Sequence, residues 1–139
     1  MRILVLILVL LFSKICMGQS KVDALTIVIK LQSSETLYDL TEAEKYIDLE
    51  RTYGDLAKKE KKTPYQLWQE FVKFNYGFST DKKFTSVFKY YDFNIRVEEV
   101  QDGFCVIFEY QDLQNGIKEI RYKLEKLEDN LKVVNISYQ

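Results

Sequence analysis

Hydrophobic and polar residues alternate along the last third of the chain, a pattern that predicts β-strands with one buried face. The alternation occupies residues 93–97, 104–110, 117–127 and 131–138. Asp102-Gly103 and Asn115-Gly116 separate the first three segments, and such pairs between alternating runs are strong hairpin signals. We therefore expect a four-stranded antiparallel meander. The 104–110 segment should be central, because it is apolar on both faces.

Helical spacing precedes the alternating segments. Thr41 and Glu44 have the spacing of a capping box, in which each side chain accepts a hydrogen bond from a backbone N–H at the helix start. We expect the first clear helix to begin at Thr41. Its apolar positions follow at helical intervals: Tyr46, Leu49, Tyr53 and Leu56.

Two more helices are predicted before the sheet. Thr63 and Gln66 form a second capping box around Pro64, whose missing N–H costs nothing in a first turn. Gly77 should end this helix. A short third helix is expected from Asp81 to about residue 91, because apolar residues recur there at i, i+3, i+4 and i+7.

The segment 24–31 fits two structures. Leu25, Ile27, Ile29 and Leu31 alternate as in a strand, whereas Ala24 and Val28 fit the start of a helix. Both interpretations stay open. The chain as a whole predicts the α+β class, with two to three N-terminal helices packed on a C-terminal four-stranded sheet.

The layout resembles the nuclear transport factor 2-like superfamily, the cystatin-like α+β cone, over about residues 41–138. The closing strand 129–138, a polar turn followed by alternation, is similar to the usual ending of that family. The resemblance implies a curved sheet that wraps around the helices and encloses a pocket. A cystatin-like sheet on one helix is the nearest alternative. The family includes enzymes, binding modules and secreted proteins, so its fold does not specify function.

The N-terminus has the pattern of a secretory signal peptide. Met1-Arg2 precedes an apolar run from Ile3 to Phe12, which is shorter than the roughly twenty residues that span a bilayer. We expect cleavage between Gly18 and Gln19, and a single mature domain over 19–139. The mature protein should then be secreted or periplasmic. An uncleaved N-terminal anchor is the alternative.

Charge argues against a nucleic-acid partner. Loss of Arg2 and Lys14 with the leader leaves 18 basic residues against 21 acidic ones, a net charge of −3. Nucleic-acid surfaces need a basic field. The dense basic stretch Lys58–Lys62 falls at a predicted helix end, where lysines suit the helix dipole and solvent. Contact with an anionic lipid or polyanion is the minor alternative. No membrane contact is expected once the leader is removed.

One cysteine remains after cleavage. Cys16 leaves with the leader, so Cys105 has no intrachain partner. Its neighbours Phe104 and Val106 favour a buried, inert strand thiol. An intermolecular disulfide or a reactive thiol is the alternative.

The chain has no histidine. This excludes Ser–His and Cys–His nucleophile pairs, the usual zinc ligand sets, and the Asp–His pair of catalytic members of the family that the layout resembles. We expect neither a metal nor a cofactor. Asp92, Glu98 and Glu99 remain as candidate acid–base groups, although each also fits a cap or a solvent-facing strand end.

Aromatic residues are the main sign of a binding site. Five of them combine a large apolar body with a polar tip, as ligand sites often do: Trp68, Tyr90, Tyr91, Tyr110 and Tyr122. Packing between helices and sheet is the alternative role.

The sequence therefore predicts a small secreted or periplasmic, non-enzymatic binding domain for a small apolar ligand or a protein partner. One alternative is a pocket enzyme of the isomerase or hydratase type that uses carboxylate and tyrosine. Another is a protein that pairs through its sheet face or its edge strand. The sequence leaves the oligomeric state open.

Overall fold

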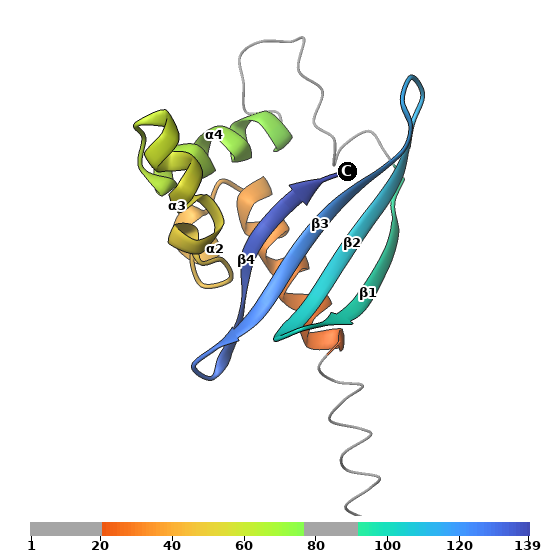
Figure 1. Cartoon of the computed structure of the whole chain (residues 1–139), viewed down its shortest axis with the longest axis horizontal. Helices are drawn as coiled ribbons and strands as arrows, with labels where there is room; N and C mark the ends of the chain where they lie inside the picture. Colours follow the sequence, from red (N-terminus) through yellow and green to blue (C-terminus); the bar gives the residue numbers. More distant parts are fainter. Residues whose placement is uncertain (1–20, 77–91) are drawn as a thin grey trace, which may run out of the picture.

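A computed structural model describes residues 21–76 and 92–139 of the chain. The predicted α+β class is confirmed: helices come first and a four-stranded antiparallel sheet follows (Figure 1). The helices are residues 21–36, α2 (Leu40–Ala43), α3 (Leu49–Glu60) and α4 (Pro64–Tyr76). The strands are β1 (Asn94–Val100), β2 (Gly103–Asp112), β3 (Gly116–Leu127) and β4 (Asn130–Tyr138). The predicted leader, the helix end at Gly77 and the helix from Asp81 lie outside the described residues.

The sheet is the predicted meander. Its strand order is β1-β2-β3-β4, so β2 is central as expected. Tight turns join consecutive strands, and the first two carry the Asp-Gly and Asn-Gly signals. Asp102 has φ +66° and Gly116 φ +79°, a left-handed backbone that Asn, Asp and Gly adopt most readily.

Gly103, the first residue of β2, permits a close approach between two strands. A Cβ atom at this position would lie 1.9 Å from the backbone oxygen of Leu124. We expect Gly103→Ala to destabilise the domain by about 3 kcal/mol, because backbone rather than a side chain must move. Gly116→Ala is the control: it meets open space and should cost only about 1 kcal/mol for its positive φ. Urea unfolding of both variants measures the difference, and equal costs would contradict the packing argument.

The first helix settles the ambiguity over residues 24–31. Residues 21–36 are helical, and Ala24, Val28 and Leu31 are all fully buried. Their i, i+4, i+7 spacing is that of one helix face. In Figure 1 this helix crosses behind the sheet and packs on the face that also meets α2–α4. The helical interpretation is therefore the correct one.

The predicted helix start at Thr41 is wrong. A short helix, α2, begins one residue earlier and is capped by Asp39, whose Oδ1 accepts a hydrogen bond from Glu42 N at 3.1 Å. The chain then leaves the helix, and Asp48 caps a separate helix, α3, by accepting from Arg51 N at 3.0 Å. Tertiary pairing explains the break. Residues 46–48 run beside β4, where Val133 N donates to Tyr46 O at 2.9 Å and Asp48 N donates to Val133 O at 2.8 Å.

The second predicted capping box is confirmed. Thr63 N donates to Gln66 Oε1 at 2.9 Å, and Gln66 N donates to Thr63 Oγ1 at 3.1 Å. Pro64 is the first residue of α4, as its missing N–H allows. Local signals were sufficient at this site, because none of the described strands pairs with the backbone of these residues.

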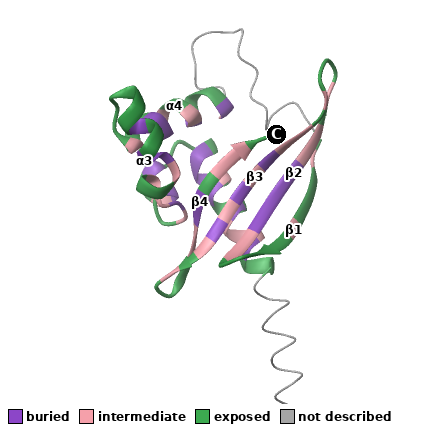
Figure 2. Ribbon diagram, viewed as in Figure 1, coloured by how far each residue is buried: buried purple, intermediate pink, exposed green. Residues whose placement is uncertain are grey.

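The core lies between the helices and the inner face of the sheet. Figure 2 shows the buried positions along the middle strands and on the helix faces turned toward them. Trp68, Val106, Ile120, Tyr122, Leu124 and Val133 have no exposed surface. Within the described residues, no helix is both long and apolar enough to cross a membrane.

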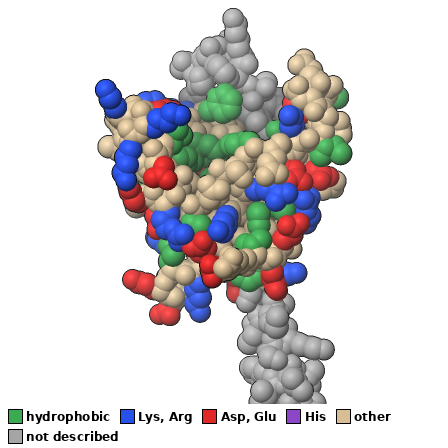
Figure 3. Space-filling view, viewed as in Figure 1, with side chains coloured by type: hydrophobic (Ala, Val, Ile, Leu, Met, Phe, Trp, Pro, Cys, Tyr) green, Lys and Arg blue, Asp and Glu red, His purple; other side chains and the backbone are tan. Residues whose placement is uncertain are grey.

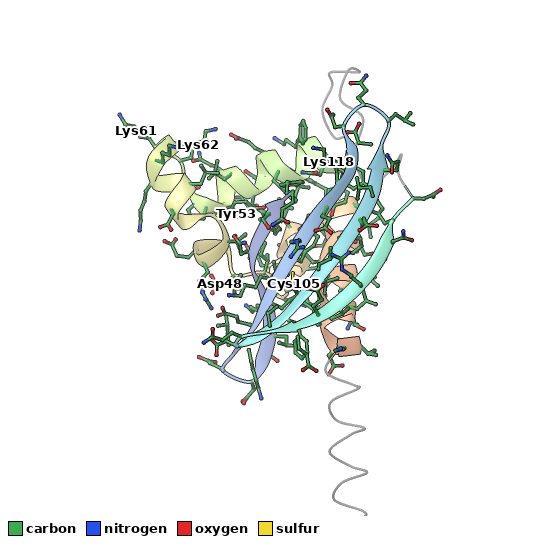
Figure 4. All side chains as sticks on the ribbon, turned by 45° about the vertical axis from the view of Figure 1, so that its right-hand side comes forward. Asp48, Tyr53, Lys61, Lys62, Cys105 and Lys118 are labelled. Atoms are coloured by element: carbon green, nitrogen blue, oxygen red, sulfur yellow. The ribbon has the colours of Figure 1, made fainter. Side chains whose placement is uncertain are left out.

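Cys105 is buried in β2, as predicted (Figure 4). It lies on the outer face of the sheet, because it pairs with Glu98 and Lys123. Burial raises the pKa of the thiol, so the thiolate that would act as a nucleophile is disfavoured.

Candidate functional site

Glu35 lies inside the domain. It belongs to the last turn of the first helix and is only 1 % exposed. Leu31 precedes it by four residues, so the carboxylate continues the apolar stripe of that helix. In the sequence Glu35 belongs to a polar run, 32–35, which is typical of a break between elements rather than of a core. The signal that could have identified it is the stripe of Ala24, Val28 and Leu31, which continues to position 35.

The surroundings of Glu35 favour its protonated form. Trp68 Nε1 donates a hydrogen bond to Glu35 Oε1 at 3.3 Å. Burial removes the carboxylate from water and raises the pKa of Glu35 to about 8, although the interactions with Trp68 and Tyr76 oppose the rise. At neutral pH the side chain is therefore mainly a neutral acid, which carries a proton inside an apolar core.

Four tyrosines from different elements surround the carboxyl group. Tyr53 comes from α3, Tyr76 from α4, Tyr122 from β3 and Tyr138 from β4. Burial is the main cause that raises the pKa of all four hydroxyls, and the negative form of Glu35 raises each of them further. We refer to the group formed by Glu35, Tyr53, Trp68, Tyr76 and Tyr122 as the Glu35 cluster.

Hydrogen bonds join the Glu35 cluster to neighbouring amides. Gln32 Nε2 donates to the Tyr122 hydroxyl at 3.3 Å. The Tyr138 hydroxyl donates to Asn75 Oδ1 at 3.3 Å, and Asn75 Nδ2 donates to Phe71 O at 2.9 Å. The cluster therefore ties the first helix and α4 to the two last strands through polar contacts.

Two polar atoms of the cluster remain unsatisfied. Among the described residues, neither Glu35 Oε2 nor the hydroxyl of Tyr53 has a hydrogen-bond partner of good geometry. Tyr53 is labelled in Figure 4. Each such buried atom costs about 1–3 kcal/mol. A well-packed core avoids this cost with apolar side chains, so these two atoms are the polar groups of the cluster that are open to a further partner.

The structure brings together only part of the predicted aromatic site. Trp68 and Tyr122 meet in the Glu35 cluster, both without exposed surface. A chain of ring contacts connects Tyr110 to them. The distance between ring centroids is 5.4 Å from Tyr110 to Phe93, 5.8 Å from Phe93 to Phe108, and 5.6 Å from Phe108 to Tyr122. Tyr90 and Tyr91 lie outside the described residues.

The carboxylates chosen from sequence lie elsewhere. Asp92, Glu98 and Glu99 are exposed, and Glu98 forms an ion pair with Arg96 at 3.2 Å. They belong to β1 and its approach, with none of the burial that changes the chemistry of Glu35. In the parts of the chain that the structure describes, no group of three His, Cys, Asp or Glu side chains could hold a metal ion.

Two surface features border the core. A groove of about 440 Å³ runs between the first helix and the end of the sheet where β2 and β4 begin. Its lining includes Ile27, Lys30, Phe104 and Leu131. At the other end, Figure 3 shows hydrophobic side chains gathered near α4 and the sheet. Phe74 of α4 is 50 % exposed there, and Tyr138 of β4 is 51 % exposed.

Comparison with known proteins adds no assignment. No family model matches the chain, and no curated protein or solved structure matches it significantly.

Proposed function

We propose that this protein is an exported, non-enzymatic binding domain that holds a small, mostly apolar ligand at the Glu35 cluster. One observation carries the proposal: a buried acid with an unsatisfied oxygen, Glu35 Oε2, lies among aromatic side chains. Small-molecule sites combine apolar lining with a few polar groups that fix orientation. Glu35 and Tyr53 supply such groups, and a ligand with one hydroxyl or carbonyl would satisfy them.

The ligand would enter beside α4. Phe71 of α4 and Tyr138 of β4 have ring centroids 6.4 Å apart, and Tyr138 bonds Asn75, the residue before Tyr76. Entry would require these two rings to move apart. The ligand would replace ring contacts with its own apolar surface and reach the carboxyl group with its polar end.

Export is part of the same proposal and rests on the sequence of residues 1–18. A domain with a resemblance to the nuclear transport factor 2-like cone, an expected cleavage after Gly18 and a buried polar cluster is consistent with a carrier or receptor module. A protein partner at the apolar end near Phe74 is the alternative occupant.

Native mass spectrometry tests the proposal on protein purified from cells that express the full-length chain. We expect a polypeptide that begins at Gln19 and retains a small molecule, which denaturation releases. Glu35→Gln should retain at least tenfold less of it, because the acidic proton is lost. Glu70→Gln, at an exposed position of α4, is the control and should retain the wild-type amount. Absence of a retained molecule from the wild type would contradict binding, and a start at Met1 would contradict export.

A second candidate function is acid–base catalysis. The pKa of about 8 favours it, because such an acid can exchange a proton near neutral pH. An isomerase or hydratase would use Glu35 with a neighbouring tyrosine. The two functions separate in one experiment: an enzyme converts the retained molecule on incubation and Glu35→Gln preserves the unconverted compound, whereas a binding domain leaves it unchanged.

A further inference from the structure

The two edges of the sheet differ in how far the chain covers them. The edge strand β4 has a register irregularity opposite Lys123 and Leu124, and Val133 bonds to residues 46–48. Bulges and covering segments are the devices by which edge strands avoid pairing with other chains. The chain thus occupies the β4 edge itself.

The β1 edge has neither a bulge nor a covering segment among the residues that the structure describes. Its seven residues, Asn94–Val100, pair with β2 without interruption and include neither proline nor lysine. Every residue of the strand except Val97 is exposed. Figure 1 shows β1 along the outer margin of the sheet, away from α2–α4. Outward N–H and C=O groups of such a strand form a template for β-augmentation.

The side chains of β1 match a second copy of themselves in antiparallel orientation. In an antiparallel strand pair, directly opposite side chains lie on the same face of the sheet. The two-fold axis of a symmetric pair therefore lies between the two copies of one residue. An axis at Val97 places Arg96 opposite Glu98 of the second copy, twice. An axis at Arg96 or at Glu98 instead places like charges opposite each other. An axis at Ile95 places Arg96 opposite the neutral Asn94. Charge therefore favours the axis at Val97, which gives two attractive pairs.

The carboxylates next to β1 favour the approach of one more positively charged side chain. Arg96 contacts Glu98, Glu109 and Glu119 at 3.2, 3.3 and 2.8 Å on the outer face of the sheet. Arg121 shares Glu119 with it at 2.8 Å. Two guanidinium groups thus form ion pairs with three carboxylates. Arg96 of a second copy would bring a further positive charge to Glu98, the carboxylate nearest the seam.

From this geometry we propose that β1 pairs with β1 of a second copy, which gives a symmetric dimer with one continuous sheet. Val97 meets its own counterpart on the inner face at the axis. Ile95, which is 48 % exposed, lies on the same face and loses part of that exposure. Backbone hydrogen bonds supply the pairing, and the Arg96–Glu98 contacts fix the register.

Sedimentation equilibrium of the purified protein tests the proposal, with charge reversals as the decisive variants. Glu98→Arg leaves arginines at both positions, and Arg96→Glu leaves glutamates at both. Each variant alone should associate at least tenfold more weakly than wild type, because like charges replace two symmetric attractions. An equimolar mixture should restore the dimer, since the two arginines of one chain then face the two glutamates of the other.

The control is Glu70→Arg, which removes an exposed ion pair with Lys62 on α4 and should dimerise like wild type. Circular dichroism confirms that each variant is folded. A wild-type protein that stays monomeric at several hundred micromolar would overturn the proposal. A Glu98→Arg variant that dimerises like wild type, or a mixture that stays monomeric, would overturn it as well.

Discussion

Glu35→Gln should abolish most of the pH dependence of stability between about pH 4.5 and pH 8. The pKa of Glu35 is raised from 4.5 to about 8 in the folded protein by burial, so the folded state holds a proton that the unfolded state releases. The contribution of the Glu35 proton to wild-type stability is therefore largest below pH 4.5 and falls as pH rises toward 8. The slope is about 1.4 kcal/mol per pH unit, which gives a total on the order of 5 kcal/mol. Above pH 8 the stabilisation that the Glu35 proton provides is fully lost.

Urea unfolding across this pH range measures the effect as the difference between wild type and variant. The difference isolates Glu35, because Glu119 and Glu125 have pKa values lowered by their arginine partners and stabilise both proteins equally as pH rises. The two proteins should be similar near pH 5, and Glu35→Gln should be the more stable one at pH 9. Trp68, the single tryptophan, provides a direct reading, since its indole contacts the carboxyl group. Parallel curves for the two proteins would contradict a buried, protonated Glu35. Glu70→Gln should follow the wild-type curve.

Trp68→Phe is expected to cost about 3 kcal/mol. Trp68 has no exposed surface, so the smaller ring leaves a cavity. The substitution also removes the N–H that donates to Glu35 Oε1. Because that hydrogen bond lowers the pKa of Glu35, its loss should raise this pKa further, and the variant should be weakest at alkaline pH.

A double-mutant cycle with Glu35→Gln separates the cost of the cavity from the cost of the lost hydrogen bond to Glu35. Circular dichroism follows unfolding, since the fluorophore is gone. The cavity cost should be the same at pH 5 and pH 9, whereas the coupling to Glu35 should grow at pH 9. Phe74→Leu, at a half-exposed position of the same helix, is the control and should cost less than about 1 kcal/mol. A pH-independent cost for Trp68→Phe would show that the indole does not interact with the carboxylate.

The sequence was most informative where structure follows from neighbouring residues. The Asp102-Gly103 and Asn115-Gly116 turns and the capping box at Thr63 depend on local backbone geometry, and all were predicted at their observed positions. The first helix was ambiguous because its exposed face carries Ile29, which is 48 % exposed and imitates a strand pattern.

The sequence was least informative where distant residues decide. The single helix expected from Thr41 is interrupted because residues 46–48 pair with Val133, far along the chain. Glu35 was missed because a glutamate is almost never buried unless it is paired, and its partner Trp68 belongs to another helix. Two of the five residues of the Glu35 cluster were thus named as site residues from the sequence: Trp68 and Tyr122 as polar-tipped aromatics, without the acid beside them.

The pairing of residues 46–48 with β4 affects how the chain can fold during synthesis. Val133 belongs to β4, which follows the helices by more than fifty residues, and Gln32 reaches Tyr122 across 90 residues of sequence. Contacts of this separation form late, because the chain must first lose the entropy of a long loop. The N-terminal helices therefore cannot complete their core until β4 has been synthesised. Until then the nascent chain keeps the apolar faces of these helices without their partner strand.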